Sequence, residues 1–157
     1  MNWPSFTNQQ LLGLYAELMG EMRTRSIVRS SNNPVADYTE NLVSKSLGLE
    51  LAGQSTSGHD ATDTSGLRYQ IKGRRVTPQN SSTQLSAIRN LSSNPFDLLA
   101  AVVFNPDFSV SYAALIPIEV IKELSRYTEH TNSNTFLFKR SVLNDPRVQT
   151  ITSRLAT

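Results

Sequence analysis

The chain has 157 residues, of which 38% are hydrophobic, so it is long enough to bury the core of one domain. It contains no cysteine, which excludes a disulfide framework and thiolate metal sites and fits a reducing compartment. Fifteen Lys and Arg residues against thirteen Asp and Glu residues give a net charge of +2, well short of a histone-like polycation.

The sequence shows no pattern of a targeting or membrane segment. Residues 1–6 lack the basic flank and the apolar stretch of a signal peptide. The longest apolar run, residues 98–104, is far too short to cross a bilayer. We therefore expect one cytoplasmic domain that spans residues 1–157.

The first predicted helix begins at a capping box formed by Thr7 and Gln10. Apolar side chains then repeat at helical spacing, which predicts one buried stripe. The stripe consists of Leu11, Tyr15, Leu18 and Met22. Three arginines follow it, namely Arg23, Arg25 and Arg29. They form either a solvated basic helix end or a local patch that meets phosphates.

The second predicted helix spans residues 34–47, with Asn33 as its N-cap and Gly48 as its stop. Its apolar arc consists of Val35, Ala36, Leu42, Val43 and Leu47. Glu40 lies at the margin of that arc. A carboxylate in this position either contacts a cation or extends into solvent.

Residues 59–75 form a predicted β-hairpin whose loop is Thr64, Ser65 and Gly66. A three-residue hairpin loop commonly closes with a glycine in the left-handed conformation, and Gly66 occupies that place. The predicted cross-strand pairs are Asp63–Leu67, Thr62–Arg68, Ala61–Tyr69, Asp60–Gln70 and His59–Ile71. Because Asp63 lies at the loop end, Asp60 is the carboxylate that we expect within the strand.

The second strand of this hairpin has an apolar and a polar face, because strand residues alternate. Leu67, Tyr69 and Ile71 fall on one side. Arg68, Gln70, Lys72 and Arg74 fall on the other, and Asp60 joins them through its pairing with Gln70. A carboxylate, an amide oxygen and a lysine in one place suit a hard divalent cation beside a water and a phosphate.

The remainder of the chain supplies the other predicted strands and helices. Residues 96–105 form a near-continuous apolar run, which predicts a central strand buried on both faces. The other predicted elements are strands at 49–51, 109–116 and 135–139, a helix at 117–127, and a last helix capped at 144–146 that carries Val148, Ile151 and Leu155. Residues 53–58 form a polar loop, and residues 76–83 form another that either is plain surface or lies along a bound duplex.

The spacing Asp-x9-(Asp/Glu/Gln)-x-Lys across two neighbouring strands, preceded by a helical Glu, resembles the PD-(D/E)xK nuclease superfamily. The matching residues are Glu40, Asp60, Gln70 and Lys72, and the match covers about residues 34–75. The sequence departs from the family pattern at two positions. His59 stands in place of Pro, and Gln70 stands in place of a carboxylate, which removes one negative charge from the metal site.

The resemblance implies an α/β domain of the restriction-endonuclease-like fold, in which helices flank a central mixed β-sheet. Its αβββαβ core would carry an extra N-terminal helix. The implied activity is hydrolysis of DNA phosphodiester bonds with Mg²⁺ or Mn²⁺. The implied metal ligands are Asp60, the Gln70 side-chain oxygen, the Ile71 carbonyl and Glu40. Lys72 would orient or deprotonate the attacking water.

Arg74 and Arg75 are candidates for contacts with the phosphates of double-stranded DNA, although only one of them shares the Lys72 face. His59 is expected on the apolar side as a core or supporting residue. The other histidine, His130, is far away in sequence, so we do not expect a zinc site built on histidines.

Three hypotheses stay open on the sequence alone. The first is a metal-dependent endonuclease, restriction-like or repair-like, with a homodimer that cuts both strands as one arrangement. The second is a DNA-binding module with the nuclease fold and little or no cleavage, which the amide at Gln70 motivates. The third is an unrelated protein-interaction domain.

Overall fold

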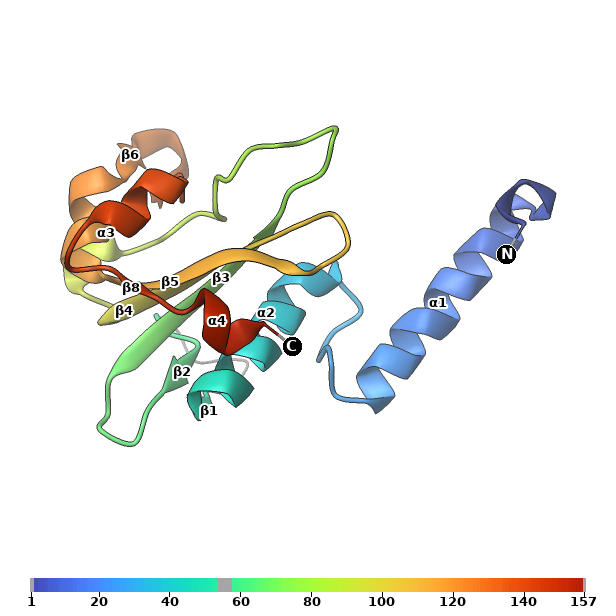
Figure 1. Cartoon of the computed structure of the whole chain (residues 1–157), viewed down its shortest axis with the longest axis horizontal. Helices are drawn as coiled ribbons and strands as arrows, with labels where there is room; N and C mark the ends of the chain where they lie inside the picture. The colour runs from blue at the N-terminus through green and yellow to red at the C-terminus, as the bar shows by residue number, and fades with distance from the viewer. Residues whose placement is uncertain (1, 54–57, 157) are drawn as a thin grey trace.

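A mixed six-stranded sheet, in the order β1-β2-β3-β4-β5-β8, organises the fold (Figure 1). The computed structural model describes residues 2–53 and 58–156. The strands of the sheet are β1 Glu50–Leu51, β2 Ala61–Thr62, β3 Arg68–Arg75, β4 Leu98–Phe104, β5 Val110–Pro117 and β8 Gln149–Thr150. The pair β3–β4 is parallel and the other pairs are antiparallel. A separate two-stranded sheet joins β6 Arg126–Thr128 and β7 Ser133–Thr135.

Helices flank the sheet, so the chain has the α/β architecture expected from its sequence. The helices are α1 Asn8–Thr24, α2 Pro34–Leu47, α3 Ile118–Leu124 and α4 Thr152–Leu155. Within the described residues, none of the helices has the length and apolarity that crossing a bilayer demands.

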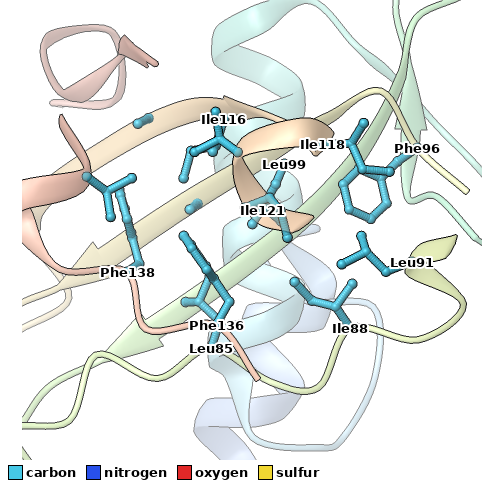
Figure 2. Packing of buried hydrophobic residues seen from close by; sticks show 14 of the residues in the cluster. Leu85, Ile88, Leu91, Phe96, Leu99, Ile116, Ile118, Ile121, Phe136 and Phe138 are labelled. Atoms are coloured by element: carbon cyan, nitrogen blue, oxygen red, sulfur yellow. The ribbon is translucent and has the colours of Figure 1, made fainter. Parts of the chain in front are cut away.

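The central strands β4 and β5 separate two hydrophobic cores. The predicted central strand is confirmed, because β4 is buried along nearly its whole length. On one face the core combines the 85–91 segment, α3 and residues 136–142 with β4 and β5 (Figure 2). On the other face α2 and α4 cover Ala100, Val102 and Ala113, whose small side chains let the helices approach the sheet. The start of β3 lies on this second face through Tyr69 and Ile71.

Helix α1 confirms its predicted cap but not its predicted buried stripe. Thr7 and Gln10 form the complete capping box. The helix stands apart from the sheet, however (Figure 1). Leu11, Tyr15 and Leu18 are therefore 38%, 51% and 58% exposed. Helical periodicity identifies an apolar face but not the surface that covers it, and here the described chain supplies no cover over most of that face.

The C-terminal third differs from the sequence prediction in three places. The helix predicted at 117–127 spans only Ile118–Leu124, because residues 126–128 pair with residues 133–135 as β6 and β7. The strand predicted at 135–139 therefore lies earlier, at Ser133–Thr135. The last predicted helix is wrong over most of its length, since Gln149–Thr150 pairs with β5 and only Thr152–Leu155 is helical.

The buried positions of this segment explain that error. Ile151 and Leu155 are buried, as predicted, but Ile151 donates its amide to Ala113 as part of the edge of the sheet. Two apolar residues four apart do not distinguish a short strand followed by one helical turn from a continuous helix. The short strand predicted at 49–51 is present as Glu50–Leu51, whereas the predicted 53–58 loop falls largely outside the described residues.

Candidate functional site

The hairpin that carries the candidate site adopts the predicted register next to its loop. Ala61 lies opposite Tyr69, and Thr62 lies opposite Arg68. Gly66 has a φ of 86°, the left-handed conformation that its place in the loop requires. The carboxylate of Asp63 accepts hydrogen bonds within this turn, from the amides of Ser65 and Leu67, and so stabilises the loop. This leaves Asp60 as the strand carboxylate.

Regular backbone pairing between β2 and β3 ends before Asp60, and the Asp60 side chain accepts the next hydrogen bond from β3 in place of a backbone carbonyl. Its amide donates to the Tyr69 carbonyl at 2.8 Å, while its Oδ2 accepts the Ile71 amide at 2.6 Å. The same Oδ2 accepts a hydrogen bond from Gln70 Nε2. The predicted proximity of Asp60 and Gln70 is therefore confirmed. The predicted pairing of His59 with Ile71 does not form, because the Asp60 carboxylate occupies the Ile71 amide.

Glu40 reaches the hairpin from α2, whose predicted limits are confirmed. Asn33 accepts from the Val35 amide as N-cap, and Gly48 ends the helix in the left-handed conformation. The helix packs closely on β3 at Gly73, where an added Cβ would lie only 1.9 Å from Thr39 Oγ1. On the same helix, Glu40 lies close enough to Asp60 for the two charges to interact.

The side chain of Glu40 is 17% exposed, and its Oε2 accepts a hydrogen bond from Arg29 Nη2. Burial raises the pKa of Glu40, and the negative charge of Asp60 raises it further against the opposing effect of Arg29. Burial also raises the pKa of Asp60, whereas the Ile71 amide and the positive charge of Lys72 oppose that rise. The two carboxylates and the lysine are thus close enough for their charges to interact.

Lys72 completes the group from the polar face of β3. Its Nζ donates to Ser86 Oγ at 2.8 Å. Burial lowers the pKa of Lys72, and the charges of Asp60 and Glu40 oppose this shift. Burial is the largest cause of this shift. Of the four predicted residues, Asp60 and Gln70 are therefore in direct contact, and the charges of Glu40 and Lys72 interact with that of Asp60.

Arg74 and Arg75 point to different surroundings, as strand alternation requires. Arg74 donates from Nε to the Ser82 carbonyl at 2.9 Å, on the side of the loop that also holds Lys72. The Arg75 guanidinium lies 4.6 Å from the centre of the Phe108 ring. Lys72, Arg74 and Arg75 line a cavity of about 770 Å³ between the start of α2, β3 and residues 77–87. Arg74 is the arginine on the Lys72 side.

The oxygen donors of this group suit a hard divalent cation such as Mg²⁺. Asp60 supplies a carboxylate, and the Ile71 carbonyl points to the same side as its amide because a strand residue directs both groups toward one neighbour. Gln70 presents its amide hydrogens to Asp60, so its oxygen turns to a shared metal only after the amide rotates. Within residues 2–53 and 58–156, no three His, Cys, Asp or Glu side chains form a metal cluster. The candidate set instead combines two carboxylates with an amide and a carbonyl.

A search with protein-family models and a search of curated proteins both find no match for this chain. The charges of the helical Glu40 and of Lys72 interact with Asp60, which is compatible with the arrangement expected from the sequence spacing.

Two residues of the site were not identified from the sequence. Arg29 belonged to a basic cluster, but the structure separates its members, since Arg25 pairs with Glu21 on α1 while Arg29 pairs with Glu40. Ser86 lies in a polar segment that carries no motif. Both contacts join residues that are distant in sequence, so no local pattern indicates them.

Proposed function

We propose that this chain is a metal-dependent endonuclease that hydrolyses DNA phosphodiester bonds, with a restriction-endonuclease-like arrangement of its sheet. The observation that carries the proposal is the convergence of Glu40, Asp60 and Lys72 beside Gln70 at the edge of β3. A bound Mg²⁺ would supply an activated water and offset negative charge on the phosphate. Asp60 would hold it with the Ile71 carbonyl and the rotated Gln70 amide, and Glu40 would hold a metal-bound water or a second ion.

Lys72 has the properties of the proton-handling group in this scheme. Its pKa is lowered by burial, so a larger fraction of the amine is neutral near physiological pH than for an exposed lysine. Ser86 fixes the position of its Nζ. The amine would take a proton from the attacking water or stay charged beside the phosphate. Arg74 lies on the same side and would contact a neighbouring phosphate of the duplex.

The second candidate function is a DNA-binding module with the same architecture and little cleavage. The contact that favours it is the hydrogen bond from Gln70 Nε2 to Asp60, which uses the candidate metal ligand as a partner for an amide donor. An amide also contributes no negative charge to hold a cation. The two functions therefore differ in what occurs after DNA binds.

Incubation of supercoiled plasmid with the protein and Mg²⁺ or Mn²⁺ tests the proposal. An endonuclease nicks or linearises the plasmid, and Lys72→Ala abolishes the reaction while leaving the fold intact by circular dichroism. Salt-sensitive DNA binding without cleavage favours the binding module instead. A chain that neither cleaves nor binds DNA contradicts both candidates and leaves the protein-interaction hypothesis.

A further inference from the structure

The ion pair between Arg29 and Glu40 lies at the point where the α1–α2 connection meets the candidate metal site. Arg29 Nη2 donates to Glu40 Oε2, and the two side chains are 37% and 17% exposed. Glu40 therefore has a cationic partner before any metal binds. Among the described charged groups around Glu40, the negative charges of Asp60 and Asp37 act together with the positive charges of Arg29 and Lys72.

Arg29 is held in this position by its backbone. Asp37, one turn before Glu40 on α2, accepts the amides of Arg29 at 2.9 Å and Ser30 at 2.6 Å. Asn41, the residue after Glu40, also binds this connection, because its Nδ2 donates a hydrogen bond to the Ser26 carbonyl at 2.5 Å. The buried side chain of Val28, which is 2% exposed, fixes the residue next to Arg29. These contacts fix the backbone that carries Arg29 beside α2.

We propose that Arg29 is the internal counter-ion of the site, which occupies Glu40 until a divalent cation displaces it and so weakens the binding of metal. This inference rests on the proposed function, because it concerns Glu40 as a group that faces a bound ion. The physical reason is competition. A metal gains the full attraction of the carboxylate only when the guanidinium gives up its charge-assisted hydrogen bond. Without the guanidinium, Glu40 is free to bind the metal. When no metal is bound, the negative charge of Glu40 then lies uncompensated beside that of Asp60.

Titration calorimetry with Mn²⁺ alone, at constant ionic strength, tests this competition. Arg29→Gln should bind Mn²⁺ about two- to fivefold more tightly than the wild type, the size expected for one ion pair that is partly exposed. Arg29→Lys keeps the positive charge but loses the planar guanidinium, so its Mn²⁺ affinity should lie between those of the wild type and Arg29→Gln. Arg25→Gln is the matched control, because Arg25 pairs with Glu21 on the exposed surface of α1 and its loss should leave Mn²⁺ affinity unchanged.

A double-mutant cycle shows whether the effect passes through Glu40. In a Glu40→Gln background, Arg29→Gln should no longer change Mn²⁺ affinity. The inference is overturned if the wild type binds Mn²⁺ and Arg29→Gln binds it equally or more weakly, a result that leaves the proposed nuclease site intact. If neither the wild type nor any variant binds Mn²⁺, and Asp60→Asn behaves like the wild type, the metal site of the proposed function fails together with the inference.

Discussion

The Ile71 amide is bound by the Asp60 carboxylate at 2.6 Å, at the position where a longer β2 would supply a backbone carbonyl. The amide next to the end of the β2–β3 pairing is therefore bound by a side chain rather than by solvent. Because backbone amides need a partner when they are buried, this contact fixes the carboxylate as firmly as a rung of the sheet. Gln70 donates to the same oxygen. A candidate metal ligand is thus part of the sheet itself.

Replacing Gln70 by Glu tests how strongly this arrangement depends on a neutral neighbour. The variant exchanges a donor to Asp60 for a second carboxylate, so the metal-free protein should lose about 1–3 kcal/mol of unfolding free energy. Its affinity for Mn²⁺ should rise about tenfold, and plasmid cleavage should accelerate. Thermal unfolding in EDTA and in Mn²⁺ measures both effects, with the exposed loop substitution Gln79→Glu as the control. Equal metal affinity in Gln70→Glu and wild type would show that residue 70 faces no ion.

In the proposed nuclease, Ser86 would act on the reaction through Lys72. Its hydroxyl accepts a hydrogen bond from Lys72 Nζ at 2.8 Å and so favours the charged amine. In Ser86→Ala that support is lost, the burial that already lowers the pKa of Lys72 is less opposed, and the pKa falls further. We expect cleavage to slow about tenfold as the amine loses its orientation.

A pH–rate profile separates this role from a structural one. The limb that reports Lys72 should move to lower pH in Ser86→Ala, because its pKa falls, and Ser86→Thr should restore the wild-type profile. Ser81→Ala, on the exposed part of the same connection, serves as the control. An unchanged rate and profile in Ser86→Ala would remove Ser86 from the mechanism.

The parts of this structure that were predicted from the sequence depend on local backbone chemistry. Asn33 and Gly48 limit α2, and Gly66 sets the hairpin register, because caps and tight turns constrain the backbone of a few consecutive residues. The proximity of Asp60 and Gln70 follows from that register. The interaction of these residues with Glu40 required only that α2 lie against β3.

The parts that were not predicted depend on contacts between distant segments. The backbone of Arg29, in the α1–α2 connection, is bound by Asp37 on α2, the helix that also carries Glu40, and Lys72 meets Ser86 across a long connection. The exposed face of α1 shows the converse case, in which a regular apolar pattern exists without a covering surface in the described chain. Periodicity and spacing along the sequence indicate neither the contacts between distant segments nor the surface that covers an apolar face.

Arg68 and Asp97 form a clamp between β3 and the start of β4 whose effect on stability depends on pH. The Arg68 guanidinium donates to both Asp97 oxygens, at 3.1 and 2.9 Å, and its amide donates to one of them at 2.8 Å. The side-chain hydrogen bond from Arg68 lowers the pKa of Asp97 below its ordinary value of 3.8. The clamp therefore stabilises the fold fully above that value, and this contribution is lost as the pH falls through the lower folded pKa.

Urea unfolding across this range tests the clamp with Asp97→Asn. The variant should be less stable than the wild type at neutral pH, and the difference should shrink as the pH falls below 3.8. Glu50→Gln, at an exposed position of β1, should follow the wild-type pH dependence. A difference between Asp97→Asn and wild type that stays constant down to strong acid would mean that the carboxylate charge contributes nothing.

Gly73 is expected to be the position of β3 that tolerates a side chain least. An added Cβ would lie 1.9 Å from Thr39 Oγ1 and 3.2 Å from the Phe104 ring, so Gly73→Ala must push α2 away from β3. We expect a loss of about 1–3 kcal/mol, the usual cost of overpacking. Thr39→Ala should recover part of that loss in the double variant, because it removes the nearest atom.

Gly20→Ala is the matched control for this substitution. No heavy atom lies within 4 Å of its added Cβ, and within α1 the change should stabilise the protein by about 0.5–1 kcal/mol. Because α2 carries Glu40, the displacement in Gly73→Ala should also weaken Mn²⁺ binding, and Thr39→Ala should restore it. If Gly73→Ala unfolds at the wild-type urea concentration, α2 does not pack on β3 as closely as described, and the approach of Glu40 to Asp60 loses its structural basis.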